Sequence, residues 1–161
     1  MKYKMIPVLL ILTALLSACN NKENPKDHLG EIYTLALDSL MEKDKALNSE
    51  MEFIAIDMSN FDGVNEEQKK TIVNHFKDKY KVEVMNATMD DLEEKGYLNP
   101  DTMALDGVLL RIENVDFTFT NNVLFEGSKF KSGLGAIGVE GTVHYKNGEW
   151  RMKELEETWV S

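Results

Sequence analysis

The sequence predicts an α+β fold in which N-terminal helices pack on a curved, mostly antiparallel sheet formed largely by the C-terminal half. In the first part of the chain, apolar residues recur at three-, four- and seven-residue steps, which is the spacing of an amphipathic helix. From Val108 onward the period changes to two, as in strands that bury one face. Helices followed by a run of strands are typical of helices that cover one face of an antiparallel sheet.

The first helix is expected over residues 25–47. Asn24 is a favourable N-cap, Pro25 suits the first helical position, and Asp27 places a negative charge in the first turn. The apolar stripe consists of Leu29, Ile32, Tyr33, Ala36, Leu37, Leu40, Met41 and Leu47.

Residues 51–58 fit two structures. Phe53 and Ile56 favour a strand, whereas Ser49 followed by Glu52 would form a helical capping box. We prefer the strand.

A second helix is expected after the turn at residues 61–63. Asn65 is its N-cap and Gln68 stands at the third helical position, which completes a capping box. Its apolar face consists of Ile72, Val73, Phe76 and Tyr80. A short strand over residues 82–84, a brief helix capped by Thr88, and a loop over residues 99–101 follow.

The strands of the C-terminal half carry two local signals. Ile112 and Val115 lie on opposite parities, and a bulge near Glu113 would return them to one face. After a turn at residues 121–122, residues 123–130 form the next strand. Asn147-Gly148 then supplies the two residues of a tight hairpin turn between alternating strands.

An uncharged apolar run over residues 5–16 follows two lysines near the N-terminus. A helix needs about 20 apolar residues to cross a bilayer, so the run has the length of an export signal rather than of a lasting span. A buried N-terminal helix is the alternative, but no polar face breaks the run as a half-exposed helix would require. Leu16-Ser17-Ala18-Cys19 closes it and resembles the lipobox of bacterial lipoproteins. That resemblance implies cleavage before Cys19 and a diacylglycerol joined to its sulfur.

The expected organisation follows from this resemblance: a signal peptide over residues 1–18, a lipidated tether over residues 19–24 and a single α+β domain over residues 25–161. The expected location is the extracytoplasmic face of the cell membrane, with the membrane as a partner through the lipid on Cys19. Cys19 is the only cysteine, so no disulfide is expected. Removal of two lysines with the signal leaves 16 basic against 28 acidic residues. A charge of this sign argues against nucleic acid as a partner.

The order of elements and the closing hairpin are similar to small secreted domains of the NTF2-like kind, and to short bacterial lipoproteins of undescribed function. The NTF2-like resemblance implies a cone-shaped pocket that an enzyme could use.

Residues 127–135 form the one stretch predicted to bind a ligand. The candidate residues for an anion or a partner are Ser128, Lys129, Lys131, Ser132, Gly133 and Gly135. Consecutive backbone amides in a flexible turn can cradle an anion, and the two lysines would add positive charge. The alternative is that these glycines mark bulges or close approach of neighbouring backbone.

No catalytic residue, metal site or cofactor is expected. His28, His75 and His144 have no second ligand at helical spacing, and the Gly-x-Gly-x-x-Gly match over residues 133–138 precedes a strand instead of a helix. The favoured function is a non-enzymatic module that binds an envelope protein, a peptide or a small ligand. The alternatives are a small hydrolase or isomerase with an NTF2-like pocket, and an accessory solute-binding protein of a transporter.

Overall fold

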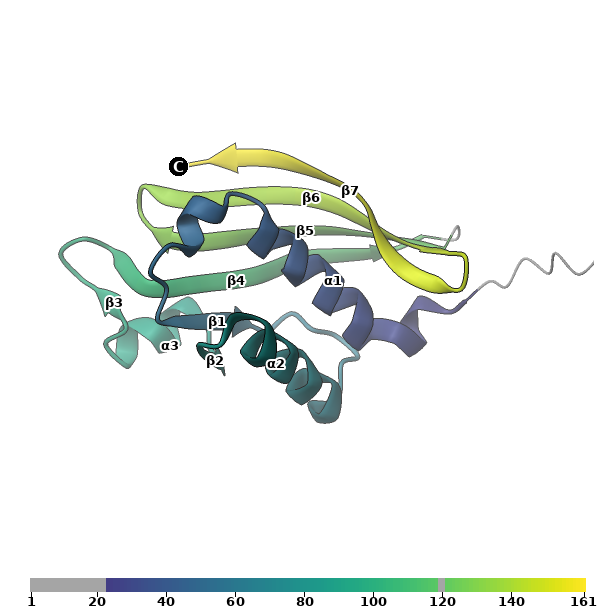
Figure 1. Ribbon diagram of the computed structural model, residues 1–161, viewed down its shortest axis with the longest axis horizontal. Helices are drawn as coiled ribbons and strands as arrows, with labels where there is room; N and C mark the ends of the chain where they lie inside the picture. Colours follow the sequence, from purple (N-terminus) through teal and green to yellow (C-terminus); the bar gives the residue numbers. More distant parts are fainter. Residues whose placement is uncertain (1–22, 119–120) are drawn as a thin grey trace, which may run out of the picture.

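A seven-stranded mixed sheet forms the centre of the structure, a computed structural model that describes residues 23–118 and 121–161 (Figure 1). The strands follow the order β2-β1-β4-β5-β6-β7, and β3 pairs with β4. The prediction of an α+β fold with a mostly antiparallel sheet, formed mainly by the C-terminal half, is confirmed. The predicted lipobox with Cys19 lies outside the described residues.

The described elements are, in chain order, the 3₁₀ helix η1 (Pro25–His28), α1 (Leu29–Glu42), the 3₁₀ helix η2 (Lys45–Asn48), β1 (Phe53–Asp57), α2 (Glu66–Tyr80), β2 (Glu83–Asn86), α3 (Met89–Glu94), β3 (Leu98–Asn99), β4 (Ala104–Phe117), β5 (Asn122–Ser132), β6 (Gly135–Lys146) and β7 (Glu149–Val160).

The helix expected over residues 25–47 is divided into three segments. Asn24 is the cap as predicted, because its side chain accepts a hydrogen bond from the Lys26 amide, but the first turn is the 3₁₀ helix η1. The α-helix ends at Glu42 because Lys43 is extended and Asp44 has a positive φ of 45°. Leu47 therefore lies in η2, outside α1.

Residues 53–57 form strand β1, so the preference for a strand is confirmed. The strand lies between β2 and β4 and runs parallel to both. All five of its residues are buried because both faces of β1 are covered, the first by α1 and α2 and the second by α3. Ile54 and Ile56 point toward α1 and α2, whereas Phe53 and Ala55 pack around Leu92 of α3.

Three local predictions are confirmed. Asn65 and Gln68 form the capping box of α2, with two reciprocal hydrogen bonds of 2.9 Å. The pairing of β4 with β5 shifts between Ile112 and Asn114, which is the expected bulge. Asn147 and Gly148 have φ angles of 57° and 89°, as a tight primed hairpin turn requires.

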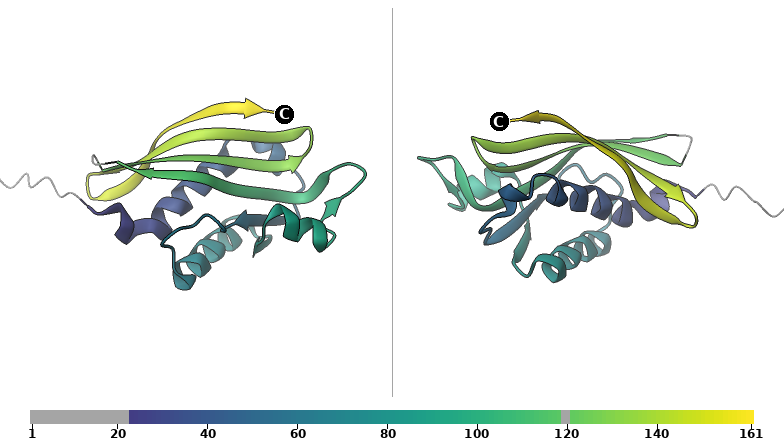
Figure 2. Two further views of the ribbon diagram at one scale, coloured as in Figure 1. Left: turned by 180° about the vertical axis from the view of Figure 1, so that it is seen from behind. Right: turned by 45° about the horizontal axis from the view of Figure 1, so that its top comes forward.

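The sheet has one covered face and one partly open face. α1 and α2 lie on the first face over the larger apolar cluster (Figure 2). α3 covers the second face only near β1 and the start of β4, where Leu98 of β3 joins the same apolar cluster. Over the rest of β4–β7, no helix of the described chain covers this second face, which we call the open face. None of the helices described is both long and apolar enough for a bilayer crossing.

Candidate functional site

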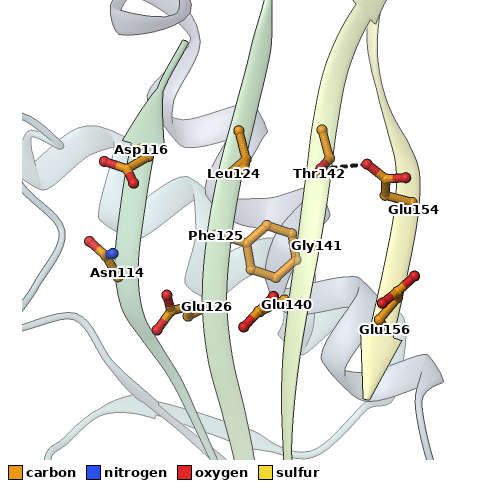
Figure 3. A pocket seen from close by; sticks show the side chains of 10 residues that line it. All are labelled: Asn114, Asp116, Leu124, Phe125, Glu126, Glu140, Gly141, Thr142, Glu154 and Glu156. Carbon is orange, nitrogen blue, oxygen red and sulfur yellow. Dashed lines mark hydrogen bonds between the residues drawn. The ribbon is translucent and has the colours of Figure 1, made fainter. Parts of the chain in front are cut away.

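Two rows of side chains cross the open face from β4 to β7, and we call them the acidic rows (Figure 3). The first row consists of Asn114, Glu126, Glu140 and Glu156, which are directly opposed in neighbouring strands. The second row consists of Asp116, Leu124, Thr142 and Glu154. Five carboxylates therefore lie on one uncovered surface.

The first row places like charges side by side. Glu140 is directly opposite Glu126 on one side and Glu156 on the other. Directly opposed residues have Cβ atoms about 5 Å apart, and like charges at that spacing destabilise a sheet. In the parts of the chain that the structure describes, no ion pair reaches these three glutamates. Their mutual repulsion is therefore not offset by an ion pair of the described residues.

The acidic rows line an open hollow of about 320 Å³. Leu124 lies between Asp116 and Thr142 in the second row, and it is 44% exposed. Glu154 is held at the edge of the hollow because it accepts a hydrogen bond of 3.0 Å from the Thr142 hydroxyl. The hollow thus offers carboxylates around one apolar contact point.

A bulge in β7 determines which residues form the acidic rows. A two-residue turn at Asn147-Gly148 pairs Val143 with Met152, and unbroken pairing would then place Lys153 opposite Thr142. The pairing shifts by one residue at Lys153, so that Glu154 takes that position. Without this bulge, a lysine would replace a glutamate on the open face.

The predicted binding stretch over residues 127–135 is mostly strand, and the expected flexible turn is limited to residues 133–134. Ser128, Lys129, Lys131 and Ser132 belong to β5, Gly133 lies in the following turn, and Gly135 begins β6. Because side chains alternate along a strand, Lys129 points to the covered face and Ser128 to the open face. The six candidate residues therefore do not converge on one ligand.

Lys129 is fully buried and holds the C-terminal end of α1. Its ammonium donates hydrogen bonds to the carbonyl oxygens of Lys43 and Asp44 and to the Asn48 side-chain oxygen. The last carbonyls of a helix lack partners within the helix, and a cation there is favoured by the helix dipole. Burial lowers the pKa of Lys129 to about 8, so the side chain is mostly charged at neutral pH. Anion binding by this stretch stays a prediction, and Lys131 is the lysine that reaches the surface.

Comparisons with protein-family models, with curated proteins and with solved structures gave no match to this chain. The function is therefore argued from the residues and their geometry.

The histidines on the helices lie beside carboxylates. His75 lies 2.8 Å from the Asp38 carboxylate, which also accepts a hydrogen bond of 2.8 Å from Lys79. His28 lies 2.8 Å from Glu23. Among the described residues, no three potential ligands are placed to hold a metal ion.

The carboxyl groups with a perturbed pKa are both shifted downward. A hydrogen bond from Lys45 lowers the pKa of Glu42, and a hydrogen bond from the Thr88 backbone lowers that of Asp91. Both groups are acids stabilised in the charged form. A general acid at neutral pH needs the opposite shift.

Proposed function

We propose that this chain is a lipid-anchored protein of the extracytoplasmic face of the cell membrane, and that its open face binds a positively charged partner. The observation that supports the binding role is the pair of acidic rows on an uncovered sheet face. A cation between Glu126, Glu140 and Glu156 would relieve the repulsion between neighbouring strands. Lysine or arginine stems would also pack on the exposed Leu124.

The partner class that fits best is a lysine- or arginine-containing segment of an envelope protein or peptide. The phosphates of nucleic acids would be repelled by the same carboxylates. A row of opposed glutamates across three strands matches cations that are spaced along an extended segment. The binding is proposed to be non-enzymatic and to require no cofactor.

The proposed anchor is compatible with access to the open face. The described chain begins, in purple, at the end of the molecule that holds the β6–β7 turn, where His28 of η1 contacts Trp150 of β7, and the long strands extend toward the other end (Figure 1). A lipid on Cys19 would bring this end to within about 14 Å of the bilayer, because four residues extend no further. The open face would then point sideways, parallel to the membrane plane.

Two charge-matched variants test the binding role. The first changes Glu126, Glu140 and Glu156 to Gln; the second changes the exposed helical residues Glu67, Glu93 and Glu94 to Gln. The probe is a labelled peptide of alternating lysine and alanine, and binding is measured by fluorescence anisotropy at several salt concentrations. We expect the first variant to lose at least tenfold in affinity and the second to stay within about threefold of the unchanged protein.

An equal loss in both variants would show that only the net charge attracts the peptide. In that case the open face is not a binding site.

A further inference from the structure

A second hollow lies at the carboxyl end of β1, where the chain order of the sheet reverses. The chain passes from β1 to β2 on one side and later returns to β4 on the other, and all three strands are parallel. In open sheets, ligands bind beyond the carboxyl ends of parallel strands at such a reversal. This hollow has a volume of about 320 Å³ and shares no residue with the acidic rows. Its volume lies within the range of sites for small ligands.

Asp57 supplies a buried negative charge to this hollow. It is the last residue of β1, and its side chain is only 6% exposed. One carboxylate oxygen accepts a hydrogen bond of 3.0 Å from the Ser59 amide, and the other lies 3.5 Å from Nε of Arg111. A carboxylate has about four acceptor positions, so Asp57 retains capacity for a further donor.

Arg111 supplies a positive charge that faces solvent. Its Cα is the pairing partner of Asp57 in β4, and its side chain is 48% exposed. Among the interactions of the described residues, the Arg111 guanidinium contacts Asp57 through Nε only. The two terminal nitrogens therefore remain available, and their planar arrangement fits the two oxygens of a carboxylate.

The remaining lining favours a ligand with both charges. Asp90 adds a second carboxylate and Ser59 adds a hydroxyl group, whereas the Thr88 hydroxyl is already hydrogen-bonded to Asp91. Two acids against one guanidinium disfavour a doubly charged anion such as a phosphate ester.

We propose that this hollow binds a small zwitterion of the amino-acid class. Its carboxylate pairs with Arg111, and its ammonium group is held by Asp57 and Asp90. This proposal goes beyond the binding role of the open face and does not depend on it.

The test measures the binding of a panel of L-α-amino acids to the purified full-length protein by isothermal titration calorimetry. Each amino acid is compared with the amine that lacks its carboxylate and with the acid that lacks its ammonium group. We expect at least one amino acid to bind with a dissociation constant below about 1 mM, and both single-charge analogues to bind at least tenfold more weakly.

The variants of the charged residues distinguish this site from general charge effects. Arg111→Gln should weaken binding of that amino acid at least tenfold, whereas Arg151→Gln should leave it unchanged, because Arg151 is an exposed arginine of β7. Asp57→Asn tests the carboxylate that is proposed to hold the ammonium group. If that variant fails to fold, Asp90→Asn replaces it and should weaken binding about threefold or more. The proposal is overturned if no amino acid of the panel binds, if an amine or acid alone binds equally well, or if Arg111→Gln has no effect.

Discussion

Lys129 shows how a buried charge can serve the end of a helix. Its ammonium donates hydrogen bonds to the carbonyl of Lys43, the C-cap of α1, and to that of Asp44, the next residue. A methionine at this position would have a similar length but no donors. Buried acceptors that lose their donor cost about 1–3 kcal/mol.

We expect Lys129→Met to reduce the free energy of unfolding by about 1–3 kcal/mol, measured by urea denaturation. Lys131→Met is the matched control, because Lys131 lies nearer the surface and donates to one carbonyl, that of Ser49. Its effect should stay within about 0.5 kcal/mol. Equal stability of the two variants would contradict the role assigned to Lys129.

The lowered pKa of Lys129 predicts a pH dependence of stability. Burial lowers the pKa to about 8 in the folded protein, against 10.5 for an ordinary lysine. Between these two values the unfolded chain binds more protons than the folded one. The cost of burying the charged ammonium therefore falls, and the free energy of unfolding rises, as the pH increases from 8 to 10.5. The urea midpoint of the unchanged protein should therefore rise relative to that of Lys129→Met over this range. A constant difference would contradict the prediction.

Glu140 is expected to lower the stability of the sheet that contains it. Two glutamates are directly opposed to it, so Glu140→Gln should raise the free energy of unfolding by about 0.3–1 kcal/mol. The gain should shrink as salt is added, because ions screen charges between exposed side chains. Thermal denaturation at low and high salt measures both effects. Glu94→Gln on α3 is the control, and it should change little.

The sequence could predict part of the candidate site at the scale of single residues. The alternation of Glu126 and Glu140 with apolar neighbours assigns them to exposed strand positions. The position of Glu154 could not be predicted, because it depends on a bulge at Lys153 that no local residue pattern marks. The role of Lys129 was missed because a lysine in a glycine-rich stretch usually points to solvent.

At the scale of elements, the residues that form local hydrogen bonds were the most informative. The capping box of Asn65 and Gln68 and the turn at Asn147-Gly148 involve neighbours in sequence, so the sequence alone predicts them. The end of α1 at Glu42 was missed. Leu47 continues the apolar period, although the positive φ of Asp44 separates it from the helix.

Gly107 allows β4 to approach β1 closely. A Cβ atom at this position would lie 2.4 Å from the carbonyl oxygen of Phe53, which is a backbone atom of β1 and cannot move freely. We expect Gly107→Ala to reduce the free energy of unfolding by about 2 kcal/mol or more. Gly133→Ala is the matched control, because its Cβ would meet only Met103 at 3.9 Å. Chemical denaturation of both variants provides the comparison, and equal stabilities would contradict the prediction.

At the scale of the whole molecule, the parallel arrangement of β2, β1 and β4 could not be predicted. β1 and β4 are far apart in sequence, and no turn connects them directly. The sequence of the β1–α2–β2 unit shows a strand, a helix and a strand, but it does not show which strands pair with each other or in which direction. The fold class could be predicted because it depends on the order of helical and strand-like spacing of apolar residues along the chain, and not on which strands pair.

The proposed anchor makes a prediction for the complete chain. Changing Cys19 to Ala should move the protein from the membrane fraction to the soluble fraction or leave it unprocessed, because the residue that carries the lipid is absent. Membrane fractionation and mass spectrometry of the native protein measure this. An unmodified Cys19 thiol in the native protein would contradict the anchor.

The exposed edge of β7 affects whether neighbouring copies of the protein can pair with each other. β7 is an edge strand, and such edges are prone to pair with another chain. Two copies meeting along β7 would each present the acidic stretch that contains Glu154, Glu156 and Glu157, so their mutual repulsion opposes stacking into ribbons. Copies held on one membrane by the proposed anchor would then remain separate.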